Sequence, residues 1–438
     1  MKERVTIIGG GLAGCEAAWQ LANRNIQVIL YEMRPEVFSP AHRSKNLAEL
    51  VCSNSLRSDR LENAVGLLKQ EMRLLDSLII KSADINRVPA GGALAVDRSE
   101  FSRYITEQIE NHKNIKIIRK HMNYIPEGPV IIATGPLSSY AISQAISDLI
   151  KEDYLYFYDA AAPIVDSSSL DLGKIFRASR YGRGEDYLNC PMSEEEYKRF
   201  WRELVNAKTV ELKYFEHQNI FEGCIPIEVM AKRGIDTLRY GPLKPVGLID
   251  PITGKEPYAV VQLRQDDRQA TMYNLVGFQT NLKFPEQKRV FSLIPGLENS
   301  TFIRYGVMHR NTFINSPAVL NKYYQLEIDP RIFFAGQITG VEGYVESASS
   351  GLVAGINMSH YVLGKPLVDF SNETAIGALA HYISDRNIKN FQPMNVNFGI
   401  IAPLDRKIRN KQQRNLEISK RALNKIDNIK ASKIVKYG

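Results

Sequence analysis

The chain has 438 residues, of which 44% are apolar and 24% charged, as is typical of a soluble globular protein with two or three domains. No apolar run approaches the roughly 18 residues that a membrane helix needs. The charged start MKERV leads directly into a strand, so we expect no signal peptide. Cys15, Cys52, Cys190 and Cys224 are scattered without a C-x-x-C pair. We therefore expect reduced thiols, a cytoplasmic location, no disulfide scaffold and no metal site.

Positive charge is concentrated at the end of the chain. Residues 406–438 carry eleven Lys or Arg and two Asp or Glu, a surplus of nine, whereas the net charge of the whole chain is +8. The remaining residues are therefore about neutral. A basic tail of this kind favours a phosphate-rich partner, but a solvated helix is an equal alternative from charge alone.

A β-α-β unit opens the chain. Residues 3–9 have the pattern of a buried strand, a helix is expected from Leu12 to about Asn23, and a second strand over 27–33. Residues 58–80 have the spacing of one amphipathic helix. Further strands are expected at 114–120 and 129–135, and a further helix at 195–208.

The pattern changes in the second half of the chain. From about 225 to 310, Pro and Gly turns separate short alternating runs such as YAVVQLR and YNLVGFQ, which is typical of an antiparallel sheet. A buried strand at 331–337 and a helix that begins ESASSG then return to the α/β pattern. The sequence predicts an α/β protein in which a nucleotide-binding domain, residues 1–185 and 305–438, is interrupted by a smaller α+β domain at 186–304.

The first strand-to-helix junction carries a dinucleotide-binding pattern. Glycines let the backbone approach a pyrophosphate, the helix N-terminus supplies partial positive charge, and an acid after the second strand accepts from ribose hydroxyls. Glu32 is that acid, and the G-x-G-x-x-G pattern comprises Gly9, Gly10, Gly11, Leu12, Ala13 and Gly14. Because the pattern lies in the expected context, it predicts binding of an ADP moiety.

Two later segments favour FAD over NAD. IIATGP resembles the strand and turn that two-dinucleotide-fold flavoproteins place beside the cofactor, and it contains Thr134 and Gly135. FFAGQITGVEGYVESASSG resembles their late motif and contains Gly336, Gln337, Gly343 and Tyr344. The helix N-terminus in this motif can stabilise a reduced, anionic flavin. We therefore expect a Rossmann-like, two-dinucleotide-fold FAD domain.

Longer segments resemble one enzyme family over almost the whole chain. They include AELVCSNSLRS, RVPAGGALAVDR, TLRYGPLKPVGL, VGFQTNLKFPEQKRV, RYGVMHRNTFINSP and MNVNFGI. These segments are similar to those of the folate- and FAD-dependent tRNA uracil-5-methyltransferases. The resemblance implies that methylenetetrahydrofolate donates one carbon to C5 of a uridine, that reduced flavin supplies the electrons, and that NADPH or NADH reduces the flavin again.

The expected chemistry gives roles to two thiols. C5 of uracil is a poor nucleophile, and a thiolate that adds to C6 makes it attack an electrophilic carbon. The resemblance assigns this nucleophile to Cys224, with Lys232 and Arg233 as candidate groups that stabilise its anion. It assigns the base that removes the C5 proton to Cys52, for which shielding or adduct formation with the flavin is the alternative. Cys15 and Cys190 are expected to be structural.

Further contacts are expected from the family motifs. His309 is a candidate for covering the pterin of the folate, with a core histidine as the alternative, and Tyr344 for packing on the flavin. Lys283 and Arg289, together with Arg98, Lys288 and the tail, are candidate contacts to RNA phosphates. A solvated surface is the alternative for each.

The sequence leaves the target RNA open. Uridine 54 in the T-loop of tRNA is the first expectation, and the same chemistry on a uridine of 23S rRNA is the alternative. Two other classes of protein are alternatives to an RNA methyltransferase. A small-molecule flavin oxidoreductase would need no Cys224, and a non-catalytic RNA-binding flavoprotein would need no thiolate at all.

Overall fold

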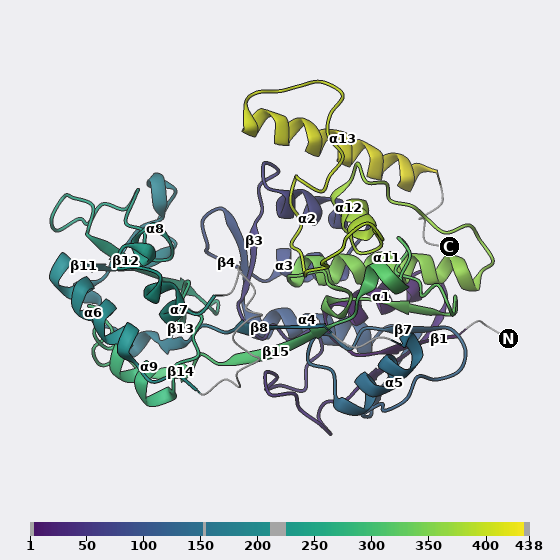
Figure 1. The fold of residues 1–438 in the computed structure, drawn as a ribbon, viewed down its shortest axis with the longest axis horizontal. Coiled ribbons are helices and arrows are strands. Elements are labelled where there is room, and N and C mark those ends of the chain that lie inside the picture. Colours follow the sequence, from purple (N-terminus) through teal and green to yellow (C-terminus); the bar gives the residue numbers. More distant parts are fainter. Residues whose placement is uncertain (1–3, 152–154, 211–224, 433–438) are drawn as a thin grey trace.

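The computed structural model describes residues 4–151, 155–210 and 225–432. It has two lobes, which strands β8 (Leu155–Ala160) and β15 (Met308–Phe313) connect (Figure 1). These strands pair antiparallel, with Leu155 opposite Phe313 and Ala160 opposite Met308. The chain therefore leaves the first lobe and returns to it along one two-stranded ribbon.

The first lobe is built on a parallel sheet, as the β-α-β pattern predicts. Its strand order is β16-β7-β1-β2-β6, and all four neighbouring pairs are parallel. The strands are β1 (Arg4–Ile8), β2 (Gln27–Glu32), β6 (Ile115–Arg119), β7 (Val130–Ile132) and β16 (Ile332–Phe334). Every residue of β7 and β16 is buried, which is typical of parallel strands covered on both faces.

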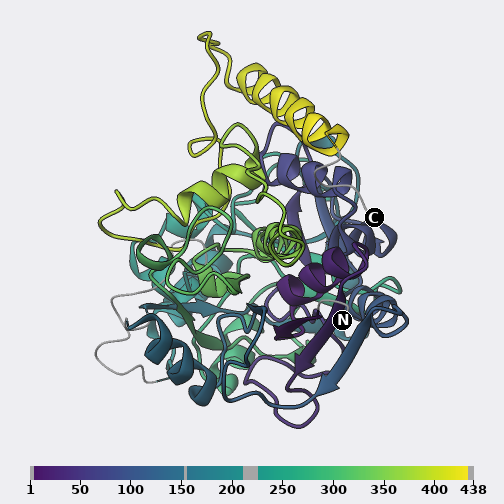
Figure 2. The same ribbon diagram turned by 90° about the vertical axis from the view of Figure 1, so that its right-hand side faces the viewer.

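Two helices pack closely over this sheet. They are α1 (Leu12–Ala22) and α11 (Tyr344–Val362), and Figure 2 shows α11 nearly end-on beside α1. A Cβ on Gly351 of α11 would lie 2.2 Å from the carbonyl oxygen of Ala13, so this contact requires glycine. The other helices of the lobe are α2 (Ala64–Leu74), α3 (Leu78–Ile85), α4 (Arg98–Glu110), α5 (Tyr140–Ile150), α10 (Ser316–Val319), α12 (Ala375–Tyr382) and α13 (Lys411–Ala431).

The single helix expected over 58–80 is wrong. Strand β3 (Ser55–Ser58) precedes α2, and the helical region is divided into α2 and α3. Asp76 adopts a left-handed φ of 57° between them. The Ser77 hydroxyl accepts a hydrogen bond from Ile80 N and so caps a new helix. Strands β4 (Arg87–Val88) and β5 (Ala93–Val96) complete a small antiparallel sheet with β3.

The second lobe has its own sheet and core. The strand order is β10-β11-β12-β13-β9-β14, and neighbouring strands are antiparallel. The strands are β9 (Ile164–Asp166), β10 (Phe176–Arg177), β11 (Tyr187–Met192), β12 (Ala259–Gln265), β13 (Met272–Leu275) and β14 (Phe302–Arg304). Since β9 and β10 precede residue 186, this sheet begins earlier in the chain than the boundary suggested by the sequence.

Helices also lie within the region from which a sheet was expected. They are α7 (Ile227–Lys232), α8 (Thr237–Tyr240) and α9 (Phe284–Phe291), while α6 (Glu194–Asn206) confirms the helix expected at 195–208. Ser193 and Glu196 form a capping box at the start of α6, and Tyr197, Phe200 and Leu204 are buried in the core of this lobe.

The basic tail forms α13, which lies on α2 at the top of Figure 1. Ser419 donates to Leu61 O at 2.8 Å, and Asn415 Nδ2 donates to Glu62 O at 3.0 Å. In the described part of the chain, no helix is both long and apolar enough to span a membrane.

Candidate active site

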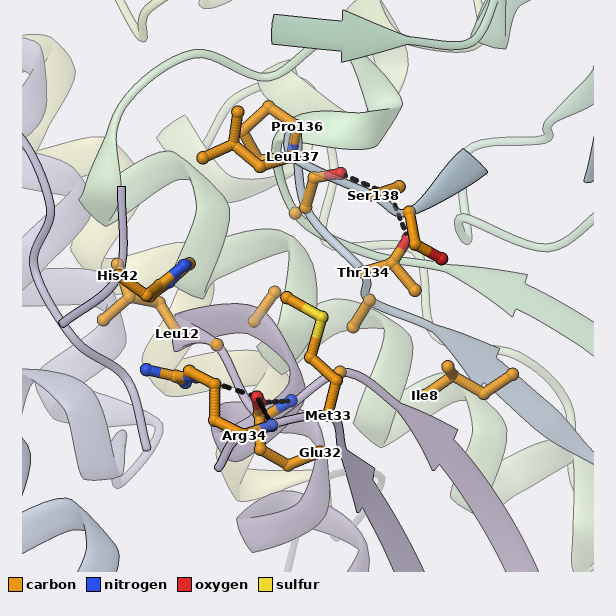
Figure 3. A pocket seen from close by; sticks show the side chains of 18 of the residues that line it. Ile8, Leu12, Glu32, Met33, Arg34, His42, Thr134, Pro136, Leu137 and Ser138 are labelled. Carbon is orange, nitrogen blue, oxygen red and sulfur yellow. Dashed lines mark hydrogen bonds and ion pairs between the residues drawn. The ribbon is translucent and has the colours of Figure 1, made fainter. Parts of the chain in front are cut away.

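A cavity lies at the carboxyl ends of β1, β2 and β7, where nucleotides bind in doubly wound folds (Figure 3). It brings together most of the expected cofactor residues. Its lining includes Gly9, Gly10, Gly11, Leu12, Ala13, Glu32, Thr134, Gly135, Gly336, Gln337 and Tyr344. Gly14 and Gly343 are not part of the lining.

The glycines have two different roles at this site. Gly9 has a φ of 106°, and a Cβ there would lie 2.4 Å from the carbonyl oxygen of Ala133, the residue that follows β7. A Cβ on Gly14 would lie 1.8 Å from Gly9 O, so Gly14 is needed for packing of helix against strand. At Gly11, by contrast, nothing lies within 4 Å of the position of a Cβ. The backbone at Gly11 is therefore open for a ligand to approach.

The start of α1 is suited to an anion. Gly11 is its N-cap, no side chain caps it, and its first turn contains no acidic residue. The N–H groups and the dipole of this helix end can therefore receive a pyrophosphate. The residues present fit the ADP part of FAD.

Glu32 lies below this helix end and has defined partners. Its Oε2 accepts from Gly10 N at 2.9 Å, and its Oε1 accepts from Arg34 N at 3.0 Å and Arg34 Nε at 2.8 Å. Burial raises the pKa of Glu32, but the hydrogen bonds and charge of Arg34 outweigh burial, so the pKa is lowered. Glu32 is therefore an ionised acceptor whose remaining lone pairs suit ribose hydroxyls.

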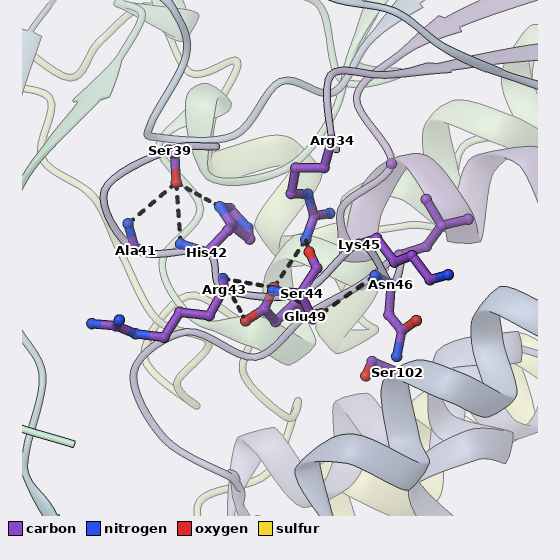
Figure 4. A network of polar contacts seen from close by, with 12 residues as sticks. Arg34, Ser39, Ala41, His42, Arg43, Ser44, Lys45, Asn46, Glu49 and Ser102 are labelled. Carbon is purple, nitrogen blue, oxygen red and sulfur yellow. Dashed lines mark hydrogen bonds and ion pairs between the residues drawn. The ribbon is translucent and has the colours of Figure 1, made fainter. Parts of the chain in front are cut away.

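Arg34 is a site residue that the sequence did not indicate. Its side chain is almost completely buried, and it bridges Glu32 and Glu49, with Nη1 at 3.0 Å from Glu49 Oε2. Glu49 also accepts from Arg43 N at 3.0 Å and from the Ser44 hydroxyl at 3.1 Å (Figure 4). The segment between residues 34 and 49 thus forms a wall of the cavity, and the two acids are paired through one guanidinium.

Two histidines also line the cavity and were missed. His42 Nδ1 lies 2.6 Å from the Ser39 hydroxyl, and His121 Nε2 lies 2.7 Å from the Ser139 hydroxyl. Neither belongs to a nucleotide-binding pattern. The sequence predicts β2 and β6, and the positions of the two histidines in the segments that follow these strands are the only signal that could have indicated them.

Tyr344 connects the cavity to the first expected catalytic thiol. It is the first residue of α11, and its hydroxyl accepts from Cys52 N at 2.7 Å and from Ser53 N at 3.1 Å. Burial raises the pKa of the Tyr344 hydroxyl, so it remains neutral. Val51 and Tyr344 both line the cavity. Cys52, which is half-buried, therefore lies at the edge of the expected flavin site.

Two expected site residues lie beyond what the structure describes. Cys224 lies outside the described residues, which resume at Ile225 just before α7. His309 belongs to β15, but its side chain is not described. The expected stabilising groups Lys232 and Arg233 lie at the C-terminal end of α7.

The structure does not bring the candidate phosphate contacts to the cavity. Lys283 is exposed at the N-cap of α9, and Arg289 forms ion pairs with Glu203 and Glu286 on the surface. Arg98 is only 14% exposed and bonds to Asp266 and Leu50 O, so its guanidinium is engaged inside the protein. The interpretation of Arg98 as an RNA contact does not agree with this arrangement.

The remaining cysteines behave as expected. Cys15 in α1 and Cys190 in β11 are completely buried, and burial strongly raises the pKa of both thiols. Both are structural residues rather than nucleophiles.

Comparison with known proteins identifies the family of this chain. Residues 4–366 match the family described as Glucose inhibited division protein A. The methylenetetrahydrofolate--tRNA-(uracil-5-)-methyltransferase of Acetivibrio thermocellus is 64% identical over 425 residues, which cover 97% of this chain and 98% of that protein. The protein of the same name from Bacillus subtilis is 61% identical over 429 residues, covering 98% and 99%.

A solved structure shows the same fold. GidA of Aquifex aeolicus superposes with a TM-score of 0.71 at 16% identity, covering 99% of this chain and 74% of that chain. The Rossmann-type fold and the family expected from the sequence are both confirmed. This chain belongs to the family of methylenetetrahydrofolate--tRNA-(uracil-5-)-methyltransferases.

Proposed function

We propose that this protein forms 5-methyluridine at uridine 54 in the T-loop of tRNA, with methylenetetrahydrofolate as the carbon donor and FAD as the electron carrier. The observation that carries the proposal is the hydrogen bond from Cys52 N to the Tyr344 hydroxyl. This hydrogen bond holds Cys52, and with it a thiol, at the edge of the dinucleotide cavity. A small-molecule oxidoreductase would not need this thiol.

The described residues would hold FAD by its ADP end. The N-terminus of α1 would receive the pyrophosphate and Glu32 the ribose, while Thr134, Gln337 and Tyr344 would lie toward the flavin. When bound, FAD supplies the electrons that convert the transferred carbon to a methyl group, and NADPH or NADH restores them.

The two thiols would act on the uracil ring. The Cys224 thiolate adds to C6 and makes C5 nucleophilic. After C5 has gained its new carbon, Cys52 accepts the proton from C5, the C5–H electrons form the C5=C6 bond, and the C6–S bond returns its pair to Cys224. Only a nucleophile that is also a good leaving group allows both steps.

A basic groove supports an RNA substrate. It lies between α13, the start of α2 and the loop at 396–409, and its walls combine apolar Phe398 and Ile408 with basic residues. Lys407, Arg409, Lys411 and Arg414 are exposed there, and none forms an ion pair with another described residue. Val396 lines this groove, and its N donates a hydrogen bond at 3.0 Å to Oε1 of Glu346, which lies in the first turn of α11. The groove is therefore in contact with the helix that carries Tyr344.

Labelled methylenetetrahydrofolate, supplied with FAD and NADPH, tests the proposed reaction on a tRNA T-arm minihelix. We expect label in 5-methyluridine, identified by mass spectrometry of the nucleosides, and no label when uridine 54 is replaced by cytidine. Label that enters only a 23S rRNA transcript would contradict the tRNA assignment. Flavin turnover without label in either RNA would favour an oxidoreductase.

Charge reversal in the basic groove tests separately whether the groove binds tRNA. The double variant K407E/R409E is expected to bind tRNA about tenfold or more weakly near physiological salt, because each side chain would neutralise one phosphate. The slope of log affinity against log salt should decrease by about 2. Filter binding across a salt series measures both quantities. K113E/K116E provides the same change of charge at exposed lysines that line neither cavity, and it should bind almost normally.

A further inference from the structure

Residues 50–54, which we call the Cys52 loop, are held at successive positions by arginines. Arg98 Nη1 donates to Leu50 O, and Arg304 Nη2 donates to Val51 O. Arg264 donates to the Ser53 hydroxyl at 2.7 Å and to Asn54 Oδ1 at 2.9 Å. Cys52 N and Ser53 N also donate hydrogen bonds to the Tyr344 hydroxyl, so every residue of the loop has at least one hydrogen-bond partner.

The three arginines come from both lobes. Arg98 begins α4 in the first lobe, whereas Arg264 on β12 and Arg304 on β14 belong to the sheet of the second lobe. Asn54 Nδ2 also donates to Gln265 O at 2.9 Å. The inserted lobe therefore contributes directly to the position of Cys52.

The positive charge around the loop exceeds the negative charge. Asp266 pairs with Arg98 at 3.0 Å. Arg264 bonds to the neutral Ser53, Asn54 and Asn274, and Arg304 bonds to a carbonyl oxygen. Arg304 Nε is buried and has no hydrogen-bond partner among the described residues. Among the described contacts of the loop, three guanidiniums and one carboxylate leave an excess of two positive charges.

These groups surround the loop that carries the Cys52 thiol. Among the described residues, Arg98 on α4, Arg304 on β14 and Tyr344 on α11 interact electrostatically with Cys52. Arg264 on β12 joins this cluster through its hydrogen bond to Ser53, and Asp266 joins it through Arg98. Tyr344 is neutral, and Asp266 is already paired. A nearby cation favours the thiolate form of a cysteine, most strongly where water is excluded.

We infer that Arg98, Arg264 and Arg304 form an inter-lobe clamp that keeps Cys52 as a thiolate at neutral pH, and that Arg304, which has no carboxylate partner among the described residues, is one of its positioning residues. The inference rests on the proposed function only for the use of this thiolate, which is acceptance of the C5 proton to give the neutral thiol. The charge state of Cys52 itself can be measured without RNA or folate.

Arg304 is the best position for a test. Removal of Arg98 would leave Asp266 buried without its partner and could unfold the protein. R304Q removes one charge, keeps a side chain that can donate to Val51 O, and leaves no unpaired acid. R304K keeps the charge. R268Q is a matched control, because Arg268 also donates across the lobes, to Ile85 O, without contacting the Cys52 loop.

The experiment measures alkylation of Cys52 by iodoacetamide in FAD-bound protein of the C224S background, followed by peptide mass spectrometry from pH 5 to 9. With R304Q we expect the pH midpoint to rise by about one unit and the rate at pH 7 to fall by about two- to fivefold. R304K should restore most of the rate, and R268Q should match the parent.

Three results would overturn the clamp. One is an unchanged midpoint in R304Q, and another is a rate that falls equally at every pH, which would indicate altered access to the thiol. A third is an equal shift in R268Q, which would indicate a general effect of lobe packing. None of these results bears on whether Cys224 attacks RNA, so failure of the clamp and failure of the proposed function are separate outcomes.

Discussion

Replacement of Gly14 by alanine is expected to yield protein that lacks flavin. The new methyl group would lie 1.8 Å from Gly9 O, a backbone atom that cannot move without displacing β1 or α1. Gly9 is itself fixed, because its N donates to Tyr31 O at 2.8 Å and its Cα faces Ala133 O. The helix end that would hold the pyrophosphate therefore shifts. We expect flavin content per mole of protein to fall at least about tenfold, and the free energy of unfolding to fall by about 2 kcal/mol or more.

Gly11→Ala is the matched control for this effect. A methyl group at Gly11 meets no protein atom within 4 Å, and φ at this residue is −77°. Its free energy of unfolding should therefore remain within about 1 kcal/mol of the parent. FAD should bind more weakly, because the methyl group occupies space that faces the cavity. Normal flavin content in G14A would contradict the proposed packing of α1 on β1.

The nucleotide site could be predicted because its determinants are local. Gly9 to Gly14 and Glu32 belong to one β-α-β unit, so their spacing alone places them at one sheet edge. Two later segments reach the same edge because β7 and β16 pair side by side in the sheet. Each of these motifs lies at the end of a predicted buried strand, so its position in the sheet could be inferred from the sequence.

The surroundings of Cys52 could not be predicted in this way. Arg304 is 253 residues from Val51, and Arg264 is 211 residues from Ser53, so neither contact leaves a local pattern. Arg98 was interpreted as a surface cation for the same reason. Its partner Asp266 is 168 residues away. Burial of a cation depends on the packing of the two lobes, which periodicity does not describe.

The error at 58–80 has a different cause. Apolar residues continue with helical spacing from α2 into α3, and the break consists of one left-handed residue and one serine cap. A serine inside a helical pattern is common, so its role as a cap became visible only in the hydrogen bond to Ile80 N.

Cys224→Ala is expected to reduce methylation of the T-arm minihelix by about a thousandfold or more while the protein stays yellow. Without the thiolate, C5 of uracil is not activated, and no other group at this position can both add to C6 and leave. Flavin content should be unchanged, because the described residues that line the cavity belong to the first lobe, and the Cys224 thiol is expected to act on the uracil ring and not to hold the cofactor. The readouts are labelled product per enzyme and flavin absorbance.

Cys190→Ala separates loss of a thiol from loss of the nucleophile. Cys190 is completely buried in β11, so its removal should cost about 1 to 2 kcal/mol of stability and leave the rate per folded enzyme nearly normal. An RNA that contains 5-fluorouridine extends the test, since fluorine at C5 prevents the final proton removal. The parent and C190A should form a covalent complex with this RNA that survives denaturation, and C224A should form none. Because the trap reports the C6–S bond directly, a normal complex in C224A would assign the addition to another residue, whatever the rate of methylation.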